Sequence, residues 1–244
     1  MFASLVVYTC GVVLLIALAL GVKPIVRLRV TRRRALGVAS SALLVVIGAL
    51  MAPVFESRTA GWTGLDRFAP VWQFHETHTL RVAAPAARVF DAILKVRADD
   101  IRLFHTLTWI RRGGRPAPAS ILNPGSTESI IDIATRTGFV RLADDPPVEV
   151  VIGTVVVAPA GARGRLTRDV FQRTLPPGFA LAAMNFRVIP DGPDASVVST
   201  ETRVFANSAG ARRRFAVYWR LIYPGSAIIR RMWLRAIEQR TLRE

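Results

Sequence analysis

The sequence has little cysteine and little histidine. Its one cysteine, Cys10, lies inside an apolar run, so a disulfide within the chain is excluded. Three histidines are present, and His75 and His78 are three positions apart in a predicted strand, where they point to opposite faces. Because a metal site needs ligands that converge on one point, we expect no metal ion and no other cofactor. No Ser-His-Asp order, phosphate-binding glycine loop or paired-carboxylate signature is present either.

Acidic residues are scarce compared with basic ones. The 244-residue chain has 17 Asp and Glu against 33 Lys and Arg, a net charge of +16. Such a charge can indicate nucleic-acid binding, but no basic run is interleaved with stacking aromatics on a strand platform. We therefore expect no nucleic-acid partner. Nearly all the cations are arginine, which fits either genomic base composition or contact with anionic lipid headgroups.

Two long runs lack charge altogether. Phe2–Val22 and Ala35–Phe55 each contain 21 uncharged residues, and a helix of that length crosses a hydrocarbon core of about 30 Å. No basic segment precedes the first run, as a signal peptide would require, so we expect it to be retained. The sequence predicts a two-helix transmembrane anchor over residues 1–55, which places the protein in the cell membrane with two spans.

The loop between the two runs is strongly basic. By the positive-inside rule this loop is cytoplasmic, which would put both termini and the remaining domain outside the cytoplasm. The domain is itself rich in arginine, however, and could equally rest against the cytoplasmic leaflet. The loop cations are Lys23, Arg27, Arg29, Arg32, Arg33 and Arg34.

Residues 56–244 have the patterns of one globular domain. Trp72–Val82 alternates and predicts a strand, Pro85 opens a helix, and Asp99 and Asp100 begin a second helix that carries Ile101 to Ile110. The order of elements predicts an α+β fold in which a curved antiparallel sheet wraps a long C-terminal helix. Further strands are predicted at 129–135, 138–142, 148–157, 166–174, 179–189 and 195–205, and the terminal helix at 208–241, with a kink or break at Pro224-Gly225-Ser226.

Three segments resemble the helix-grip fold of the SRPBCC superfamily, which includes START lipid-transfer domains and polyketide cyclase/dehydrase-like proteins. "HTLRVAAPAARVFDAI" (His78–Ile93) is similar to the family's first strand, turn and helix, and "FRVIPDGPDASVVSTETRVF" (Phe186–Phe205) to its last hairpin. "ARRRFAVYWRLIYPGSAIIRRMWLRAI" (Ala211–Ile237) resembles the terminal helix of a bacterial membrane-anchored subgroup. The resemblance covers about residues 74–241 and implies an elongated apolar cavity between sheet and terminal helix. It implies no particular reaction.

The predicted ligand site combines two titratable groups with an apolar lining. Glu76 and His78 share a strand face with Phe74, so both groups would enter the cavity, where they could orient a ligand or act as acid and base. Structural pairing of both side chains is the competing interpretation, and a filled core is the competing interpretation of the apolar lining. The candidate ligand-binding residues are Phe74, Glu76, His78, His105, Met184, Phe186, Thr200, Thr202, Phe215, Tyr218, Trp219 and Ile222.

Charged residues elsewhere in the domain are expected on its surface. In the last predicted hairpin, Glu201 and Arg203 face away from the terminal helix, which indicates a surface ion pair of little energetic value. The terminal helix has an apolar stripe and an opposite, solvated face. The arginines predicted on that face are Arg212, Arg213, Arg220, Arg230, Arg231 and Arg235.

Three functions remain open from the sequence. The leading hypothesis is a membrane-anchored protein that binds a lipid or another hydrophobic molecule in the cavity; enzyme activity is left open, and a binding role is favoured. The second is a cyclase or dehydratase that uses Glu76 and His78. The third is an interaction module whose Arg-rich face docks on a membrane or an acidic partner, through contacts that weaken with salt.

Overall fold

The computed structural model describes residues 2–22, 31–125, 127–162 and 166–243. The predicted loop cations Lys23, Arg27 and Arg29 lie outside the described residues. The chain forms two compact units. One comprises Met1–Val54 with Ala216–Pro224, and the other comprises Phe55–Phe215 with Gly225–Glu244.

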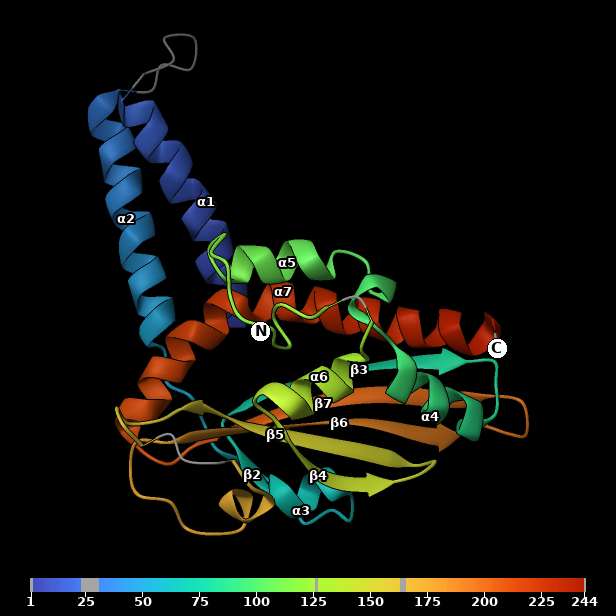
Figure 1. Ribbon diagram of the computed structural model, residues 1–244. Helices are drawn as coiled ribbons and strands as arrows, with labels where there is room; N and C mark the ends of the chain where they lie inside the picture. Colours follow the sequence, from blue (N-terminus) through green and yellow to red (C-terminus); the bar gives the residue numbers. More distant parts are fainter. Residues whose placement is uncertain (1, 23–30, 126, 163–165, 244) are drawn as a thin grey trace. The chain divides into compact units, whose positions relative to one another are not determined.

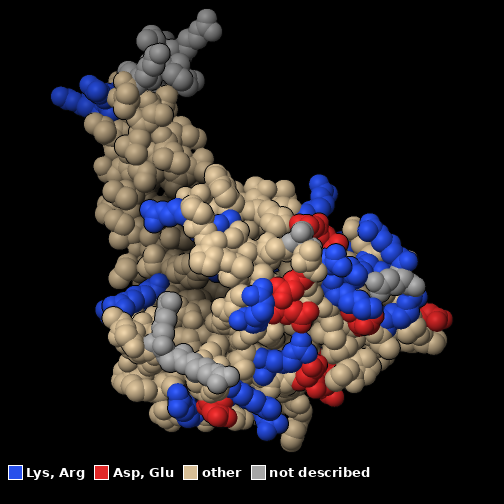
Figure 2. Space-filling view, in the orientation of Figure 1, with Lys and Arg blue, Asp and Glu red and all other residues tan. Residues whose placement is uncertain are grey.

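The first unit is built on two paired helices, α1 (Phe2–Val22) and α2 (Arg32–Met51). Small side chains of α2, at Ala35, Ala39 and Ala42, are buried and recur at helical spacing, which lets two backbones approach closely. Both helices are long and apolar enough to cross a membrane. Helices of this length and composition also occur in protein cores and, near an N-terminus, as signal sequences. Figure 2 shows that the surface of the helix pair is uncharged over most of its length.

Within this unit, Arg220 binds the C-terminal end of α2. Its guanidinium donates hydrogen bonds to the carbonyl oxygens of Leu50, at 2.5 Å, and Ala52, at 2.6 Å. These carbonyls are left without partners where a helix ends, and a cation is favourable at that end of the helix dipole. Arg220 is 6% exposed. The prediction that it lies on a solvated face is therefore wrong.

A five-stranded antiparallel sheet forms the centre of the second unit, with strand order β3-β7-β6-β5-β4. Along β3, burial alternates as predicted, because successive side chains point to opposite faces of the sheet. The predicted hairpin turn at 191–194 joins β6 to β7. The strands are β3 (Phe74–Val82), β4 (Val140–Asp145), β5 (Glu149–Val157), β6 (Ala180–Pro190) and β7 (Ser196–Ala206); β1 (Ser57–Arg58) and β2 (Val71–Trp72) form a separate two-stranded pair.

Helices cover one face of this sheet and enclose the main core. Figure 1 shows α4 (Ala86–Lys95) and α6 (Ile130–Thr137) on the same side of the sheet as α7 (Ala209–Arg243). From Gly225 onward α7 contributes Trp233, Leu234 and Ile237 to a cluster with sheet residues. Burying each large apolar side chain contributes roughly 1.5–3 kcal/mol. The predicted fold class is confirmed: an α+β unit with an antiparallel sheet and a long C-terminal helix, together with two N-terminal apolar helices.

The opposite face of the sheet is covered as well, by a helix too short to be predicted. Helix α3 (Gly64–Phe68) begins with a capping box between Thr63 and Asp66 and places Leu65 and Phe68 against β4, β5 and β6. A short 3₁₀ helix, η3 (Arg168–Phe171), adds Phe171 to this second core. The second face of the sheet is therefore covered over parts of β4, β5 and β6, whereas the outward side chains of β3 stay exposed.

Segment 129–135 is a helix, so its prediction as a strand is wrong. The isoleucines at 130, 131 and 133 favour a strand by propensity. However, the Ser129 side chain accepts a hydrogen bond from the Asp132 amide, and this cap begins α6. The helix then buries all three isoleucines, of which Ile130 and Ile131 belong to the main core.

Two further predictions are corrected by local conformation. The helix expected from Asp99 to Ile110 is divided into η2 (Ala98–Asp100) and α5 (Phe104–Arg111), because Leu103 has a left-handed backbone with φ of 62°. The strand expected at 166–174 contains η3 instead. In that turn Val170 is buried, and the Arg168 guanidinium lies over the Phe68 ring at 4.8 Å.

Helix α7 continues through the predicted break at residues 224–226. Proline within a helix removes one backbone donor but does not always end the helix. Within α7 the chain passes from one compact unit to the other twice, between Phe215 and Ala216 and between Pro224 and Gly225.

Candidate functional site

A cluster of polar side chains lies inside the helix-covered face of the sheet. Antiparallel register sets Glu76 opposite Thr202 and His78 opposite Thr200. The side chains of Glu76 and His78 are 2% and 10% exposed, and Glu76 Oε1 lies 2.9 Å from His78 Nε2. From α7, the Ser226 hydroxyl donates to Glu76 Oε2 at 2.8 Å. The carboxyl group is thus held by an imidazole and a hydroxyl in a largely apolar layer.

Arg230 of α7 brings a positive charge to the same cluster. Its guanidinium donates to the hydroxyl oxygens of Thr202, at 3.0 Å, and Thr200, at 3.4 Å. Burial lowers the pKa of Arg230 to about 10, the nearby Glu76 carboxylate opposes this shift, and Arg111 adds to it. Arg230 therefore stays protonated at neutral pH. Its carbon Cζ also lies 5.7 Å from the centre of the Trp233 ring.

The Glu76–His78 contact restricts the state of the imidazole. A hydrogen bond between Nε2 and the carboxyl group needs one proton between them. When the imidazole is neutral and Nε2 donates to the carboxylate, Nδ1 is the ring nitrogen that can accept a proton. A carboxylate that orients an imidazole in this way is a common feature of general-base sites.

Aromatic side chains pack around the cluster. Phe74 meets Phe215 edge-on with ring centres 4.9 Å apart, and Phe186 meets Trp233 with ring centres 4.7 Å apart. Met184 and Phe186 are buried in the same core. Much of the space between the sheet and this part of α7 is filled by side chains.

A groove runs beside His78, along the outer strand of the sheet. It lies between β3 and the C-terminal half of α7 and has a volume of about 520 Å³. Small-molecule sites commonly have volumes of about 300–1,000 Å³. The apolar side chains Leu80, Met232 and Leu234 line it, and Arg231 and Arg235 supply positive charge. His78 therefore belongs to both the polar cluster and the groove.

The structure brings together eight of the twelve predicted ligand-binding residues. They lie on the helix-covered side of the sheet and are buried or half-buried: Phe74, Glu76, His78, Met184, Phe186, Thr200, Thr202 and Phe215. His105 lies elsewhere, more than half exposed, with its Nε2 atom 2.7 Å from Asp99. Tyr218, Trp219 and Ile222 belong to the segment that groups with α1 and α2.

Sequence reasoning missed Ser226 and Arg230. Ser226 was interpreted only as part of a helix break, and Arg230 was placed on a solvated face, which is wrong. A signal was present, because residues 226, 230, 233 and 237 recur at helical spacing and include Trp233 and Ile237 of the predicted apolar stripe. Arginine within such a stripe indicates a buried, partnered cation.

The pair Glu201–Arg203 is not a surface ion pair, so that prediction is also wrong. The Arg203 side chain is 8% exposed, with Nε 2.6 Å from Glu201 and Nη1 2.7 Å from Asp66. Burial raises the pKa of Asp66, but hydrogen bonds from Thr63 and Arg203 outweigh it and the net pKa is lowered. This network connects α3 to the sheet and is structural.

No group of three or more His, Cys, Asp or Glu within the described ranges could hold a metal ion. His75 and His78 do point to opposite faces of β3, and His75 pairs with Glu201 at 2.9 Å.

Comparison with known proteins gives structural neighbours only. No family model matches the chain, and no curated protein sequence matches it. The similar solved structures include an aromatase/cyclase from a Streptomyces species, with 12% identity, coverage of 68% of this chain and 94% of that one, and a TM-score of 0.27. CalU16 from Micromonospora echinospora has 13% identity, 78% and 94% coverage and a TM-score of 0.27. A Thermus thermophilus protein has 10% identity, 70% and 98% coverage and a TM-score of 0.28.

These neighbours include the kind of protein that the sequence resemblance named, an aromatase/cyclase. With identities of 10–13% and TM-scores below 0.3, they assign no activity or ligand to this chain. The fold class rests on the elements described above.

Proposed function

We propose that this protein is a membrane-tethered helix-grip protein that binds a hydrophobic small molecule or lipid beside α7. The ligand lies in the groove between β3 and α7, with its polar end toward His78 and the Glu76–Arg230 cluster. The groove and the cluster belong to one compact unit and share His78. That shared residue is the observation on which the proposal depends most.

The polar cluster supports a role in binding because it is costly to bury. Carboxylate and guanidinium groups lose hydration when they leave water, and each loss costs several kcal/mol before partners compensate. Here Glu76 and Arg230 do not form one direct ion pair, since their hydrogen bonds go to Ser226, His78 and the threonines. Separate, oriented donors and acceptors of this kind suit a ligand's hydroxyl or carbonyl group.

The paired helices support tethering. Leu5, Leu15 and Leu44 are 65%, 68% and 69% exposed on α1 and α2. An exposed apolar surface of this extent is unusual in a soluble monomer and fits contact with lipid tails. We propose that both helices span the membrane and that the sheet unit lies outside the cytoplasm. Tethering would confine the search for a poorly soluble ligand to the bilayer surface.

Blocking the groove tests this function. The full chain in lipid nanodiscs is titrated with a fluorescent fatty-acid probe, with empty nanodiscs as the blank. Leu80→Trp enlarges a half-buried groove side chain on the same face of β3 as His78 and should reduce probe binding at least tenfold. Ile189→Trp is the matched control, because Ile189 is also an aliphatic residue on a strand and lies outside the groove. Equal binding by both variants and the wild type would exclude the groove as the site.

The second candidate function is a cyclase- or dehydratase-type enzyme. The hydrogen-bonded Glu76–His78 pair favours it, since the carboxylate fixes an imidazole that reaches the groove. Such an enzyme should convert its ligand rather than retain it. Glu76→Gln keeps a hydrogen-bond partner for His78 but removes the negative charge, so it should leave ligand retention nearly intact and abolish turnover. Retention of unchanged ligand by the wild type would favour the binding protein.

A further inference from the structure

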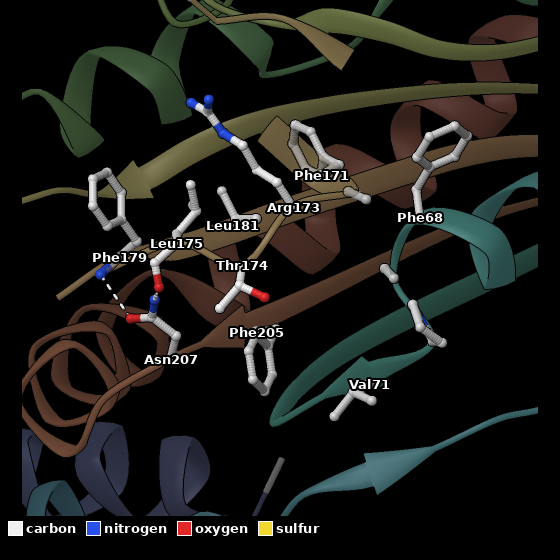
Figure 3. Close-up of a pocket in the computed structure, with 13 residues that line it drawn as sticks. Phe68, Val71, Phe171, Arg173, Thr174, Leu175, Phe179, Leu181, Phe205 and Asn207 are labelled. Atoms are coloured by element: carbon white, nitrogen blue, oxygen red, sulfur yellow. Dashed lines mark hydrogen bonds between the residues drawn. The ribbon is translucent and has the colours of Figure 1, made fainter. Parts of the chain in front are cut away.

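We infer that a second ligand site lies on the opposite face of the sheet, and that it takes a small aromatic carboxylate. A pocket of about 310 Å³ opens there between α3, η3 and the loop that precedes β6. Its walls carry four phenyl rings, from Phe68, Phe171, Phe179 and Phe205 (Figure 3). This volume is at the small end of the range of ligand sites, enough for a compact molecule and too small for a long lipid chain.

The sheet separates this pocket from the groove beside His78. Leu181 and Ala183 line the pocket from β6, whereas Met184 and Phe186 of the same strand pack on the helix-covered side. Odd- and even-numbered positions of a strand point to opposite faces. The two sites therefore share no side chain, and each can be changed without altering the lining of the other.

One wall of the pocket is fixed by Asn207. Its Oδ1 accepts hydrogen bonds from the backbone amides of Gly178, at 3.0 Å, and Phe179, at 2.9 Å. Its Nδ2 donates to the carbonyl oxygens of Leu175, at 3.1 Å, and Pro176, at 2.7 Å. Figure 3 shows this side chain beside Phe179 and Leu175. A single amide thus orders the loop that carries two lining residues, so little conformational entropy would be lost when a ligand binds.

The opposite wall is fixed by close packing. A Cβ atom added at Gly153 of β5 would lie 2.4 Å from Phe171 Cζ, so the Phe171 ring rests directly on the glycine backbone. The neighbouring Phe68 ring is held beneath the Arg168 guanidinium. Aromatic walls with fixed orientation favour a flat aromatic ligand, because rings attract one another in edge-on and offset arrangements.

The charge of the lining selects an anion. Arg173 is the charged side chain among the lining residues, which include no Asp or Glu. In the part of the chain that the structure describes, the Arg173 guanidinium forms no ion pair with a carboxylate. Arg173 is an exposed residue at the rim of the pocket (Figure 3). Guanidinium groups bind carboxylates through paired, charge-assisted hydrogen bonds. An aromatic ring with one carboxylate matches both the rings and the cation.

Binding of 2-naphthoate to the full chain in lipid nanodiscs tests this inference. The fluorescence of the bound probe is compared with that of empty nanodiscs, and 2-naphthalenemethanol serves as the neutral analogue. Arg173→Gln should weaken 2-naphthoate binding by about three- to tenfold, as expected for an exposed charged contact, and leave the neutral analogue unaffected. Leu181→Trp, which fills the pocket, should abolish binding of both compounds.

Variants of the groove provide the control. Arg231→Gln and Leu80→Trp alter the groove beside His78 and should leave 2-naphthoate binding unchanged. If they remove it while Leu181→Trp does not, the probe occupies the groove, and the second site is refuted while the proposed function stands. Equal binding by the wild type, Arg173→Gln and Leu181→Trp would also overturn the inference. Fatty-acid binding at the groove is read separately, so each site is tested alone.

Discussion

Arg203 shows how a single buried cation can hold one layer of the molecule to the next. It contacts Asp66 of α3 and Glu201 of β7, and it lies 4.1 Å from the Trp72 ring centre. Its guanidinium also donates to the carbonyl oxygen of Ala69, at the end of α3. Removing one partner of a buried ion pair leaves the others desolvated without compensation.

Arg203→Met should therefore destabilise the sheet unit by about 3 kcal/mol. The measurement is urea unfolding of the full chain in nanodiscs, followed by tryptophan fluorescence. Arg81→Met is the control, because the ion pair of Arg81 with Asp191 is exposed on both sides and should contribute less than about 1 kcal/mol. Equal losses of unfolding free energy for the two substitutions would show that the buried network contributes no more to stability than an exposed ion pair.

The same network predicts a dependence of stability on pH. Burial raises the pKa values of Asp66 and Glu201, but hydrogen bonds outweigh this effect, so both pKa values are lowered overall. Thr63 and Arg203 donate to Asp66, and His75 and Arg203 donate to Glu201. Because the folded pKa values lie below the ordinary ones of 3.8 and 4.5, their contribution to stability is full above about pH 5 and is lost as pH falls through the folded values. Unfolding free energy should fall from pH 5 to pH 3, and Asp66→Asn should flatten that slope. An unchanged slope in the variant would contradict the assignment.

At the scale of elements, α6 shows a cap overriding strand propensity. Ser129→Ala removes the hydroxyl that accepts the Asp132 amide and should cost about 1 kcal/mol of unfolding free energy. Thr135→Ala is the matched control, because the Thr135 hydroxyl bonds back to its own helix and caps nothing. A loss with Thr135→Ala as large as that with Ser129→Ala would argue against a cap.

The sequence predicted the elements whose periodicity is long enough to read. Nine residues of β3 alternate in burial, and the turn at Asp191 fixes the hairpin of β6 and β7. Helix α3 was missed because its five residues contain too little of a helical period. Without α3, the second face of the sheet was taken as solvent-exposed, and Arg203 was placed there for that reason.

Part of the candidate site was predicted as well, again because strand alternation could be followed in the sequence. Strand alternation was enough to put Glu76 and His78 on one buried face. The contribution of α7 depends on which of its many arginines turns inward, and the arginine-rich composition hides this at Arg230. Tyr218 and Trp219 were assigned to the ligand site by helical spacing alone. Spacing along a 35-residue helix cannot show that its middle, Ala216–Pro224, belongs to a different compact unit from its two ends.

At the scale of the whole molecule, the proposed function puts the helix pair in the membrane and the sheet unit outside the cytoplasm. With Cys10→Ser in the background, Ala60→Cys places a thiol at an exposed position after α2. If the sheet unit lies outside the cytoplasm, a membrane-impermeant maleimide should label this cysteine in intact cells. Labelling only after lysis would place the unit on the cytoplasmic side, where its arginines could contact anionic lipid.

Native mass spectrometry of the full chain, released from nanodiscs, tests the central claim most directly. Its mass is compared with that under denaturing conditions, for the wild type and for Leu80→Trp. We predict a stoichiometric apolar adduct on the wild type that dissociates on denaturation and is absent from the variant. A wild-type chain with no adduct, which also fails to take up the fatty-acid probe, would contradict the account and point to an interaction module with a filled core.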